Sequence, residues 1–541
     1  MSATGVIHGE ILTRPWVVSL ILDLTGYTAN KDLAHSRIVE PAAGTGAFVA
    51  IIIDRLLESA NRQGIDVTVS SVGRAIRAFD IQEENCRVLR QLVTDKLLSA
   101  GAPPRVARSL ADLWVVHDDY LLPKPEHALE HIDVVVGNPP YIRMEDIPTT
   151  QAQQYRQAYP TMTGRADIYI AFFEAGLRSL RPEGKLAFIC ADRWMRNDYG
   201  KGIRRFITTQ GFSIDAIITA HEADVFERQV DAYPAIVVLR HGAQAGVSIA
   251  DTTAELTSRQ APALAKAVLT HKHLAAPTFT VGVVDHWAAT GTEPWPHGSP
   301  LTIERLSSLD ALPTIEETGA RIGIGIATGA DGVYVTNPKR PLPEIEQGRL
   351  LPLSHADDIR KGVWNWTGRY LVNPWEPEGL INLDEFPRMK DYLLSHDVVR
   401  SRNVAHRNPS SWWRTIDRVA YRLLDRPLIL LQDMSQEVTP VIAPPGFYPH
   451  HNLYWIDVQN SGWDPEVLAG ILLADQIREQ IAARCVLMRG KTLRLQAQYL
   501  RQIHLPAPTQ VSKSAAAGFR SAYKTRDRRK ATNTLAGLLP A

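Results

Sequence analysis

The sequence contains few cysteines, no long apolar run and no secretory leader pattern. Its three cysteines, Cys86, Cys190 and Cys485, lie far apart and lack the spacing of metal ligands. We therefore expect free buried thiols rather than disulfides or a cysteine metal site. No apolar run reaches the roughly 18 residues that a membrane span needs, and the N-terminus lacks a basic segment followed by an apolar one. These absences favour a cytoplasmic protein without membrane association.

Length and composition indicate a globular protein of more than one domain. The 541 residues are 45% hydrophobic and 22% charged, and the length favours two large domains. The net charge is only +1, yet residues 481–541 carry twelve Lys or Arg against one acid, Asp527. Such asymmetry indicates either a polyanionic partner for the C-terminal end or a solvated basic face with a disordered tail.

The stretch Asp133–Tyr141 has the clearest chemical pattern in the chain. Its run of β-branched residues predicts a buried parallel strand. Pro139 and Pro140 follow closely and end the strand, because proline fixes φ and donates no backbone hydrogen bond. The loop at the carboxyl end of this strand, where ligands bind in open α/β sheets, then carries the Asn138 amide, the Pro139 carbonyl and the Tyr141 ring.

This loop suits methylation of a planar amino group. Asn138 Oδ1 and the Pro139 carbonyl can both accept hydrogen bonds from one exocyclic NH2, and Tyr141 offers a face on which a base can stack. A plain Asn-Pro turn would explain these three residues taken alone. The full tetrapeptide Asn138-Pro139-Pro140-Tyr141 after an apolar strand, however, resembles the catalytic motif of S-adenosylmethionine-dependent amino-methyltransferases. It is most similar to that of the TaqI-type, gamma-class DNA adenine-N6 methyltransferases of bacterial restriction–modification systems.

Residues Arg37–Phe48 predict a strand, a Gly-rich turn and the start of a helix. Glycines let backbone amides approach a ligand, and a helix N-terminus adds positive potential. The third glycine of the dinucleotide-binding fingerprint is missing. The resemblance implies that this stretch binds the methionine part of S-adenosylmethionine, with Glu40 facing the ammonium group; helix capping is the alternative. The implied cofactor residues here are Glu40, Pro41, Gly44, Gly46 and Phe48.

Two further acids end predicted strands. Asp80 closes the strand over residues 77–79, where an acid fits hydrogen bonding to ribose hydroxyls; an N-cap of the following helix is the alternative. The strand over residues 114–116 leads to Asp118 and Asp119. The family pattern, an Asp followed by an aromatic residue and Leu, implies that Asp119 binds the adenine amino group of the cofactor, and Asp118 is the alternative.

Thr13 and Pro15 open a helical pattern that runs to Leu24. Thr13 suits an N-cap and Pro15 the first turn, and capping alone would explain both. The stretch also resembles the N-terminal motif X of the gamma class, in which this helix packs against the methionine end of the cofactor. That family has Pro directly after the Thr, whereas Arg14 intervenes here.

The remaining elements of the first half predict one α/β domain over residues 1–245. A helix over about 166–180, a strand over 184–190 and closing strands over 214–218 and 235–239 complete the pattern. The resemblance implies a Rossmann-like fold with a mixed, mainly parallel sheet. It also implies an aromatic residue on the second face of the target base, for which we choose Phe226; an ordinary core phenylalanine is the alternative.

The second half predicts a connection, a second domain and a tail. Residues 246–300 are rich in Ala, Thr, Gly and Pro and predict a connection with one short helix over about 263–271. Residues 301–510 resemble an α+β target-recognition domain, with one helix over about 465–488. Seven arginines between Arg400 and Arg426 interleave with aromatic residues, and arginine suits phosphate and guanine recognition. Residues 511–541 predict a basic, disordered tail.

Together these features predict an S-adenosylmethionine-dependent, sequence-specific adenine-N6 methyltransferase. The target base would be flipped out of double-stranded DNA. We expect a monomer that needs no metal, with any restriction endonuclease encoded separately. The alternatives are methylation of glutamine side chains or RNA, transfer to cytosine N4, and a non-catalytic DNA-binding protein with a relic cofactor fold.

Overall fold

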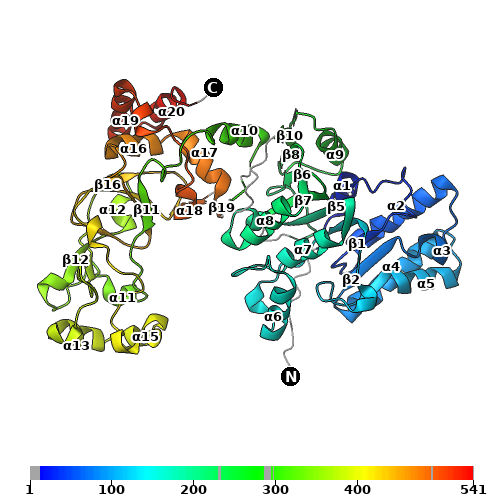
Figure 1. The fold of residues 1–541 in the computed structure, drawn as a ribbon, viewed down its shortest axis with the longest axis horizontal. Coiled ribbons are helices and arrows are strands. Elements are labelled where there is room, and N and C mark those ends of the chain that lie inside the picture. The colour runs from blue at the N-terminus through cyan, green and yellow to red at the C-terminus, as the bar shows by residue number, and fades with distance from the viewer. Residues whose placement is uncertain are drawn as a thin grey trace. The chain divides into compact units, whose positions relative to one another are not determined.

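The computed structural model describes residues 12–228, 233–284, 294–295, 298–485, 487–488 and 492–539. The chain forms two units, Met1–Glu304 and Arg305–Ala541, and each has its own sheets and core (Figure 1). Within the described ranges, every helix is too short or too polar to cross a membrane.

A ten-stranded mixed sheet forms the centre of the first unit. Its order is β3-β2-β1-β4-β5-β7-β6-β8-β10-β9. The first five strands in this order are all parallel, and β7 is antiparallel to both β5 and β6. The strands are β1 (Ile38–Glu40), β2 (Ile76–Asp80), β3 (Val115–His117), β4 (Ile132–Gly137), β5 (Leu180–Ala191), β6 (Phe212–Thr219), β7 (Pro234–His241), β8 (Val247–Thr252), β9 (Leu274–Ala276) and β10 (Phe279–Val284).

The order of the strands reverses at β1. The chain runs from β1 outward through β2 and β3, then returns to place β4 on the other side of β1. In open α/β sheets the crevice outside the carboxyl ends of the two strands at such a reversal is where ligands bind. Glu40 ends β1 and Asn138 follows β4, so both residues lie at this crevice.

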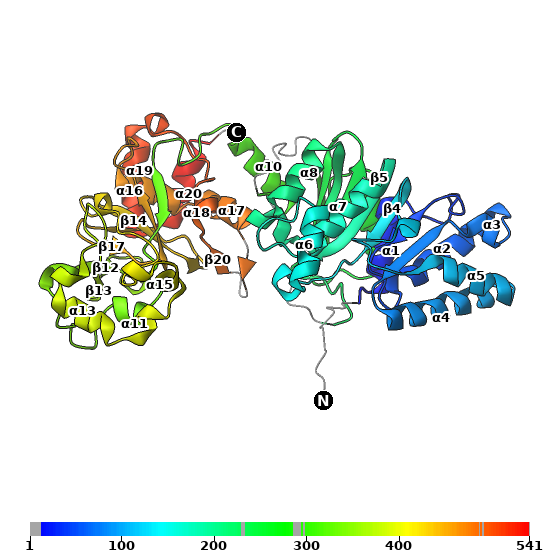
Figure 2. The ribbon, with the colours of Figure 1, turned by 60° about the horizontal axis from the view of Figure 1, so that its bottom comes forward.

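Helices cover both faces of this sheet (Figures 1 and 2). Side chains alternate between the faces along each strand, so Val135 of β4 packs in one core, whereas Val134 and Val136 pack in the other. The helices are α1 (Pro15–Thr25), α2 (Ala47–Gln63), α3 (Val69–Val72), α4 (Glu83–Ser99), α5 (Pro104–Trp114), α6 (Thr149–Ala158), α7 (Tyr169–Ser179), α8 (Lys201–Thr209) and α9 (Ala261–Leu269), while α10 (Pro300–Leu309) spans the boundary of the two units.

The prediction that residues 246–300 form a connection is wrong. The expected short helix is present as α9, but the residues around it form β8, β9 and β10 and extend the central sheet. Their alternation of apolar residues is diluted by Ala, Thr and Gly, which hides the strand pattern. The first unit therefore continues to Glu304 instead of ending near residue 245.

The second unit is an α+β structure with three small sheets. These sheets have the orders β11-β18-β14-β16, β13-β12-β17 and β15-β20-β19. The strands are β11 (Arg321–Ile324), β12 (Leu350–Ser354), β13 (Tyr370–Val372), β14 (Leu428–Gln432), β15 (Met434–Ser435), β16 (Val441–Ala443), β17 (Tyr448–Pro449), β18 (Leu453–Asp457), β19 (Leu487–Met488) and β20 (Thr492–Arg494). The helices are α11 (Asp331–Tyr334), α12 (Ala356–Ile359), α13 (Pro387–Leu394), α14 (Asp397–Arg400), α15 (Asn403–Arg407), α16 (Pro465–Leu472), α17 (Asp475–Arg484), α18 (Ala497–Leu500), α19 (Lys513–Thr525) and α20 (Arg528–Ala536).

The prediction of a disordered tail over residues 511–541 is also wrong. Helices α19 and α20 pack against α16 (Figure 1). Phe519 is fully buried, and a Cβ at Gly470 would come within 2.2 Å of the Phe519 carbonyl oxygen. Basic residues of the tail also form ion pairs, such as Arg520 with Asp464 at 2.8 Å. The excess of charge concealed an apolar stripe on α19, whose Phe519 and Ala522 are buried.

The helix predicted over residues 465–488 is divided into α16 and α17. Asp475 is the first residue of α17, and its backbone amide donates a hydrogen bond of 3.0 Å to Thr532 Oγ1 of α20. The Asp475 carboxylate also pairs with Arg528. Contacts from α20 thus stabilise the N-terminus of α17. The local sequence around Asp475 gives no sign of them.

Candidate functional site

A cavity of about 210 Å³ lies at the carboxyl ends of the parallel strands of the first unit. Predicted site residues from five separate stretches of the chain line it, namely Thr13, Glu40, Pro41, Gly44, Phe48, Asp80, Asp119, Asn138, Pro140 and Tyr141. Four other predicted residues, Pro15, Gly46, Pro139 and Phe226, do not line this cavity in the described part of the chain. The topology of the sheet therefore brings most of the predicted residues together.

Glu40 brings an unusual buried carboxylate to this cavity. Its side chain is 3% exposed, and Oε2 has no hydrogen-bond partner among the described residues. Burial raises the pKa of Glu40 well above its ordinary value, and the nearby charge of Asp80 adds to this, while a hydrogen bond from the Val49 backbone amide opposes it. A buried acceptor of this kind is costly unless a donor reaches it. The geometry fits a cationic ammonium group beside Glu40.

The Gly-rich turn after β1 is held tightly in place. Gly46 has φ of 101°, and a Cβ at this position would lie 2.6 Å from Leu92 Cδ2 and 2.7 Å from Leu89 Cδ1 on α4. Only glycine fits this combination of positive φ and close approach. The Gly44 amide donates a hydrogen bond of 2.9 Å to Asp80 Oδ2. This turn leads into α2, whose N-terminus directs positive potential towards the same region.

Asp80 has a role different from the predicted alternative of an N-cap. The N-cap of α4 is Gln82, and Asp80 accepts a hydrogen bond of 2.8 Å from its backbone amide. The second carboxylate oxygen of Asp80 fixes the glycine turn through Gly44. Asp80 therefore joins the ends of β1 and β2 at the cavity.

Asp118 and Asp119 both line the cavity but differ in their contacts. Burial raises the pKa of Asp118, but hydrogen bonds from His127 and from backbone amides outweigh it and hold the pKa below its usual value. These bonds include 2.7 Å to His127 Nδ1 and 2.9 Å to the Lys124 amide, so Asp118 stabilises its own loop. Asp119 accepts a hydrogen bond of 2.9 Å from the Leu121 amide of its own loop, and also one of 2.7 Å from the hydroxyl of Tyr155, a cavity residue on α6. These contacts favour Asp119 as the ligand-binding acid.

Asn138 is oriented by Thr13. The Asn138 Nδ2 atom donates a hydrogen bond of 3.3 Å to Thr13 Oγ1, so the acceptor oxygen Oδ1 lies on the opposite side of the amide. Thr13 is buried and forms a backbone bridge with Phe226. The prediction that Thr13 caps the following helix is wrong, because the N-cap of α1 is Arg14. Pro15 is the first residue of α1, as expected for proline.

The two predicted aromatic residues have different surroundings. The Tyr141 ring lines the cavity beside Asn138, and its centroid lies 6.2 Å from that of Tyr169 in an edge arrangement. Burial raises the pKa of Tyr141, so its hydroxyl stays neutral. Phe226 is only 6% exposed and belongs to the core that includes Val225. The position of Phe226 matches the alternative of a core phenylalanine, and stacking on a base would require it to leave that core.

Tyr155 and Gln151 are cavity residues that the sequence prediction missed. Both lie on α6, and Gln151 Nε2 donates a hydrogen bond of 2.6 Å to the Tyr155 hydroxyl. Helix α6 is otherwise polar, and Tyr155 is its only buried residue. A single aromatic residue in a polar helix, with an amide four positions earlier, was the available signal.

Several arginines of the predicted nucleic-acid-binding stretch have internal roles. Arg402 is 7% exposed and donates hydrogen bonds to backbone carbonyls that include Thr328 at 2.7 Å. Arg426 donates a hydrogen bond of 3.1 Å to the buried Asp457. Arg400 and Arg407 are exposed on the surface. The arginine pattern thus combines structural residues with ones available to a ligand.

Comparisons with known proteins place these features in a family context. A family model described as Eco57I restriction-modification methylase matches residues 104–226. The chain is 38% identical over 513 residues to the Type II methyltransferase M.BstVI of Geobacillus stearothermophilus, covering 93% of this chain and 90% of that protein. It is 37% identical over 547 residues to the Type II methyltransferase M.XhoI of Xanthomonas vasicola, covering 98% and 97%.

The fold has a solved counterpart over nearly the whole chain. The Type IIL restriction-modification enzyme MmeI, solved in complex with DNA, matches with a TM-score of 0.59 and 11% identity, covering 96% of this chain and 73% of that one. At this identity the likeness concerns the fold alone. The predicted class, an α/β methyltransferase domain with a mixed, mainly parallel sheet followed by an α+β domain, is confirmed.

Proposed function

The chain belongs to the Type II methyltransferases, and on this premise we propose that it transfers a methyl group from S-adenosylmethionine to adenine N6 in double-stranded DNA. One observation carries the proposal. Glu40, at the end of β1, and Asn138, after β4, line the same cavity at the point where the strand order reverses. A donor and an acceptor of the methyl group would thus meet at the site that this sheet topology provides.

The residues of the cavity fit S-adenosylmethionine. Glu40 would hold the ammonium group of the cofactor through its buried Oε2, which has no protein partner among the described residues. Asp80 lies at the end of the adjacent strand, where an acid suits ribose hydroxyls. Asp119 suits the exocyclic amino group of the cofactor adenine, with its carboxylate oriented by the Leu121 amide and the Tyr155 hydroxyl. The bound cofactor supplies an electrophilic methyl group on its sulfonium sulfur.

Asn138 and Pro139 act on the amino group of the target base. Both offer oxygen acceptors, so together they bind the two hydrogens of one NH2 group and direct the nitrogen lone pair away from the base plane. The Thr13 hydroxyl accepts the hydrogen bond from Asn138 Nδ2, so Asn138 Oδ1 faces away from Thr13. Tyr141 stacks on the base, which must be flipped out of the duplex. Catalysis consists of placement and electrostatics, and no residue forms a covalent intermediate.

The second unit is proposed as the target-recognition domain. Exposed arginines such as Arg400 and Arg407 suit phosphate contacts, which position a protein on DNA, while base contacts specify the sequence. We propose that the protein acts as a monomer in the cytoplasm and that any restriction endonuclease is a separate protein.

The proposal is tested by replacing Asn138 with alanine. Wild-type protein, S-adenosylmethionine and DNA should yield N6-methyladenine, detected by mass spectrometry of digested nucleosides. Asn138→Ala should reduce the rate by about 100-fold or more, since hydrogen bonds made in the transition state are lost, while cofactor affinity stays nearly unchanged. Asn61→Ala, an exposed asparagine of α2, is the matched control and should retain full activity.

Two outcomes would refute this assignment. Appearance of N4-methylcytosine instead of N6-methyladenine would replace adenine by cytosine as the target. Full transfer by Asn138→Ala would remove Asn138 from the catalytic mechanism, whichever base is methylated.

A further inference from the structure

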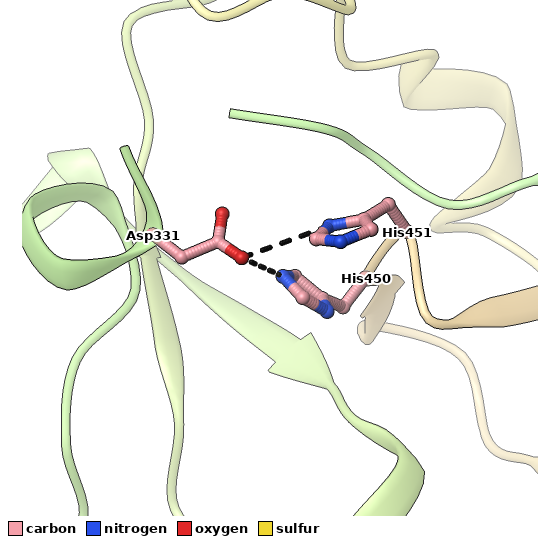
Figure 3. Close-up of side chains that lie close together, drawn as sticks. All are labelled: Asp331, His450 and His451. Carbon is pink, nitrogen blue, oxygen red and sulfur yellow. Dashed lines mark hydrogen bonds and ion pairs between the residues drawn. The ribbon is translucent and has the colours of Figure 1, made fainter. Parts of the chain in front are cut away.

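Three potential metal ligands converge in the second unit, far from the cavity of the first unit in the sequence. They are Asp331, the first residue of α11, and the adjacent pair His450 and His451, which follows β17 (Figure 3). One ligand atom of each residue lies within 4.8 Å of the other two. Asp331 Oδ2 lies 3.1 Å from His450 Nε2 and 3.7 Å from His451 Nδ1.

The backbone that carries the two histidines is held from both sides. The His450 amide donates a hydrogen bond of 2.9 Å to the Ser354 carbonyl, and the His451 amide donates one of 3.1 Å to the Ile326 carbonyl. A Cβ at Gly325 would lie 2.2 Å from the His450 carbonyl oxygen, so the backbone at Gly325 packs directly against the backbone at His450. The fold therefore fixes the backbone from which both imidazoles project.

The carboxylate of Asp331 is oriented as well. Its Oδ1 accepts a hydrogen bond of 2.5 Å from the hydroxyl of Thr328, which is fully buried. This bond leaves Oδ2 directed at the two imidazoles (Figure 3). Hydrogen-bonded partners of this kind orient the ligands in metal sites.

We propose that Asp331, His450 and His451 bind one divalent transition-metal ion of the zinc class. Two imidazoles and one carboxylate are typical zinc ligands, and ligand atoms about 3.3 Å apart fit bonds of about 2.0 to 2.1 Å in a tetrahedron. Two imidazole nitrogens disfavour magnesium and calcium, which prefer oxygen ligands. A cavity of about 340 Å³ borders Asp331 and His450, and it provides room for a water molecule as the fourth ligand.

A plain hydrogen bond between Asp331 and His450 explains less of the geometry. One histidine is sufficient for such a bond, yet the His451 imidazole approaches the same carboxylate oxygen. The ring centroids of His450 and His451 lie 4.1 Å apart. The His451 Nδ1 atom is buried without a hydrogen-bond partner among the described residues. A metal ion would satisfy this nitrogen and join segments that are 119 residues apart. The site is independent of the proposed methyl transfer.

Metal binding by the full chain tests the proposal. The protein is stripped with a chelator and dialysed against Zn²⁺, and bound zinc is measured by mass spectrometry. One equivalent is expected for the wild type, and Co²⁺ in its place should give the intense visible bands of a four-coordinate ion. Asp331→Asn and His451→Asn should each lose the equivalent, whereas His406→Asn, an exposed histidine of the same unit, should retain it.

Thermal unfolding shows whether the variants remain folded and whether the ion binds the native state. The metal-free Asp331→Asn and His451→Asn variants should unfold cooperatively, because both side chains are partly exposed. Zinc should raise the Tm of the wild type and of His406→Asn and leave the other two unchanged. Absence of bound zinc in the wild type, or an unchanged equivalent in both ligand variants, would overturn the proposal.

Discussion

Replacing Glu40 with glutamine should weaken cofactor binding and stabilise the cofactor-free protein. Glutamine keeps the shape of the side chain but removes its charge. The wild-type carboxylate is buried at 3% exposure, and burial raises its pKa well above the ordinary value of 4.5. Without a cationic partner this carboxylate is unfavourable, and with an ammonium group it is favourable, so the two effects have opposite signs.

The expected loss of affinity follows from the hydrogen bond to a charged group. Such a bond contributes about 1.5 to 3 kcal/mol, which corresponds to a Kd for S-adenosylmethionine that is about 10- to 150-fold higher in Glu40→Gln. Isothermal titration calorimetry on both proteins measures this ratio directly.

The pH dependence of stability should differ between the two cofactor-free proteins. The folded pKa of Glu40 lies above its unfolded value, so the folded protein holds the proton more tightly than the unfolded chain does. This contribution is fully present below about pH 4.5 and is lost as the pH rises towards the folded pKa, by at most about 1.4 kcal/mol per pH unit. Glutamine does not titrate, so Glu40→Gln does not lose stability in this way as the pH rises. The difference in free energy of unfolding between Glu40→Gln and the wild type should therefore increase with pH.

Chemical denaturation across the pH range measures this difference. A Kd ratio below about threefold, well under the roughly tenfold minimum for a hydrogen bond to a charged group, would show that no ammonium group meets Glu40. A free-energy difference that does not change with pH would show that the carboxylate is not destabilised by burial.

Three further variants test other contacts. Thr13→Val removes the acceptor for Asn138 and should slow single-turnover methyl transfer by about 2- to 12-fold, the value of one hydrogen bond; an unchanged rate would mean that Thr13 does not position the amide. Tyr155→Phe should raise the Kd for the cofactor by a similar factor without affecting the rate at saturation, and an unchanged Kd would contradict a role in binding. Phe519→Ala should lower the free energy of unfolding by about 3 to 5 kcal/mol, and a loss below 1 kcal/mol in urea would show that α19 adds little to the core.

Local patterns were sufficient to predict the cavity residues near strand ends. Glu40 and Asp80 end β1 and β2, and Asn138 follows β4; parallel strands place such residues at one edge of the sheet. The catalytic and cofactor roles of these residues stay predictions. The choice between Asp118 and Asp119 required the hydrogen bonds that each carboxylate accepts, which depend on loop conformation.

Long-range packing determined the features that the sequence did not reveal. Phe226 is in the core because its strand-like segment bridges Thr13, more than two hundred residues earlier. The tail helices are ordered because α16 presents a glycine where α19 must approach closely. The metal ligands Asp331 and His450 come together only through tertiary contacts, since no short-range spacing connects them.

The wall of the cavity includes a piece of chain that lies outside all the helices. Leu12, Thr13 and Arg14 precede α1; the Leu12 carbonyl accepts a hydrogen bond from the Glu227 amide, and the Arg14 amide donates one to the Val225 carbonyl. Leu12 and Thr13 line the cavity. A shortened chain that starts at Pro15 would contain the residues of every helix and strand described, but it would lack Arg14, the N-cap of α1, and the backbone hydrogen bonds to residues 225 and 227. It would also lack the hydroxyl that holds Asn138. For this protein, trimming the N-terminal end to the limits of regular structure would damage the site.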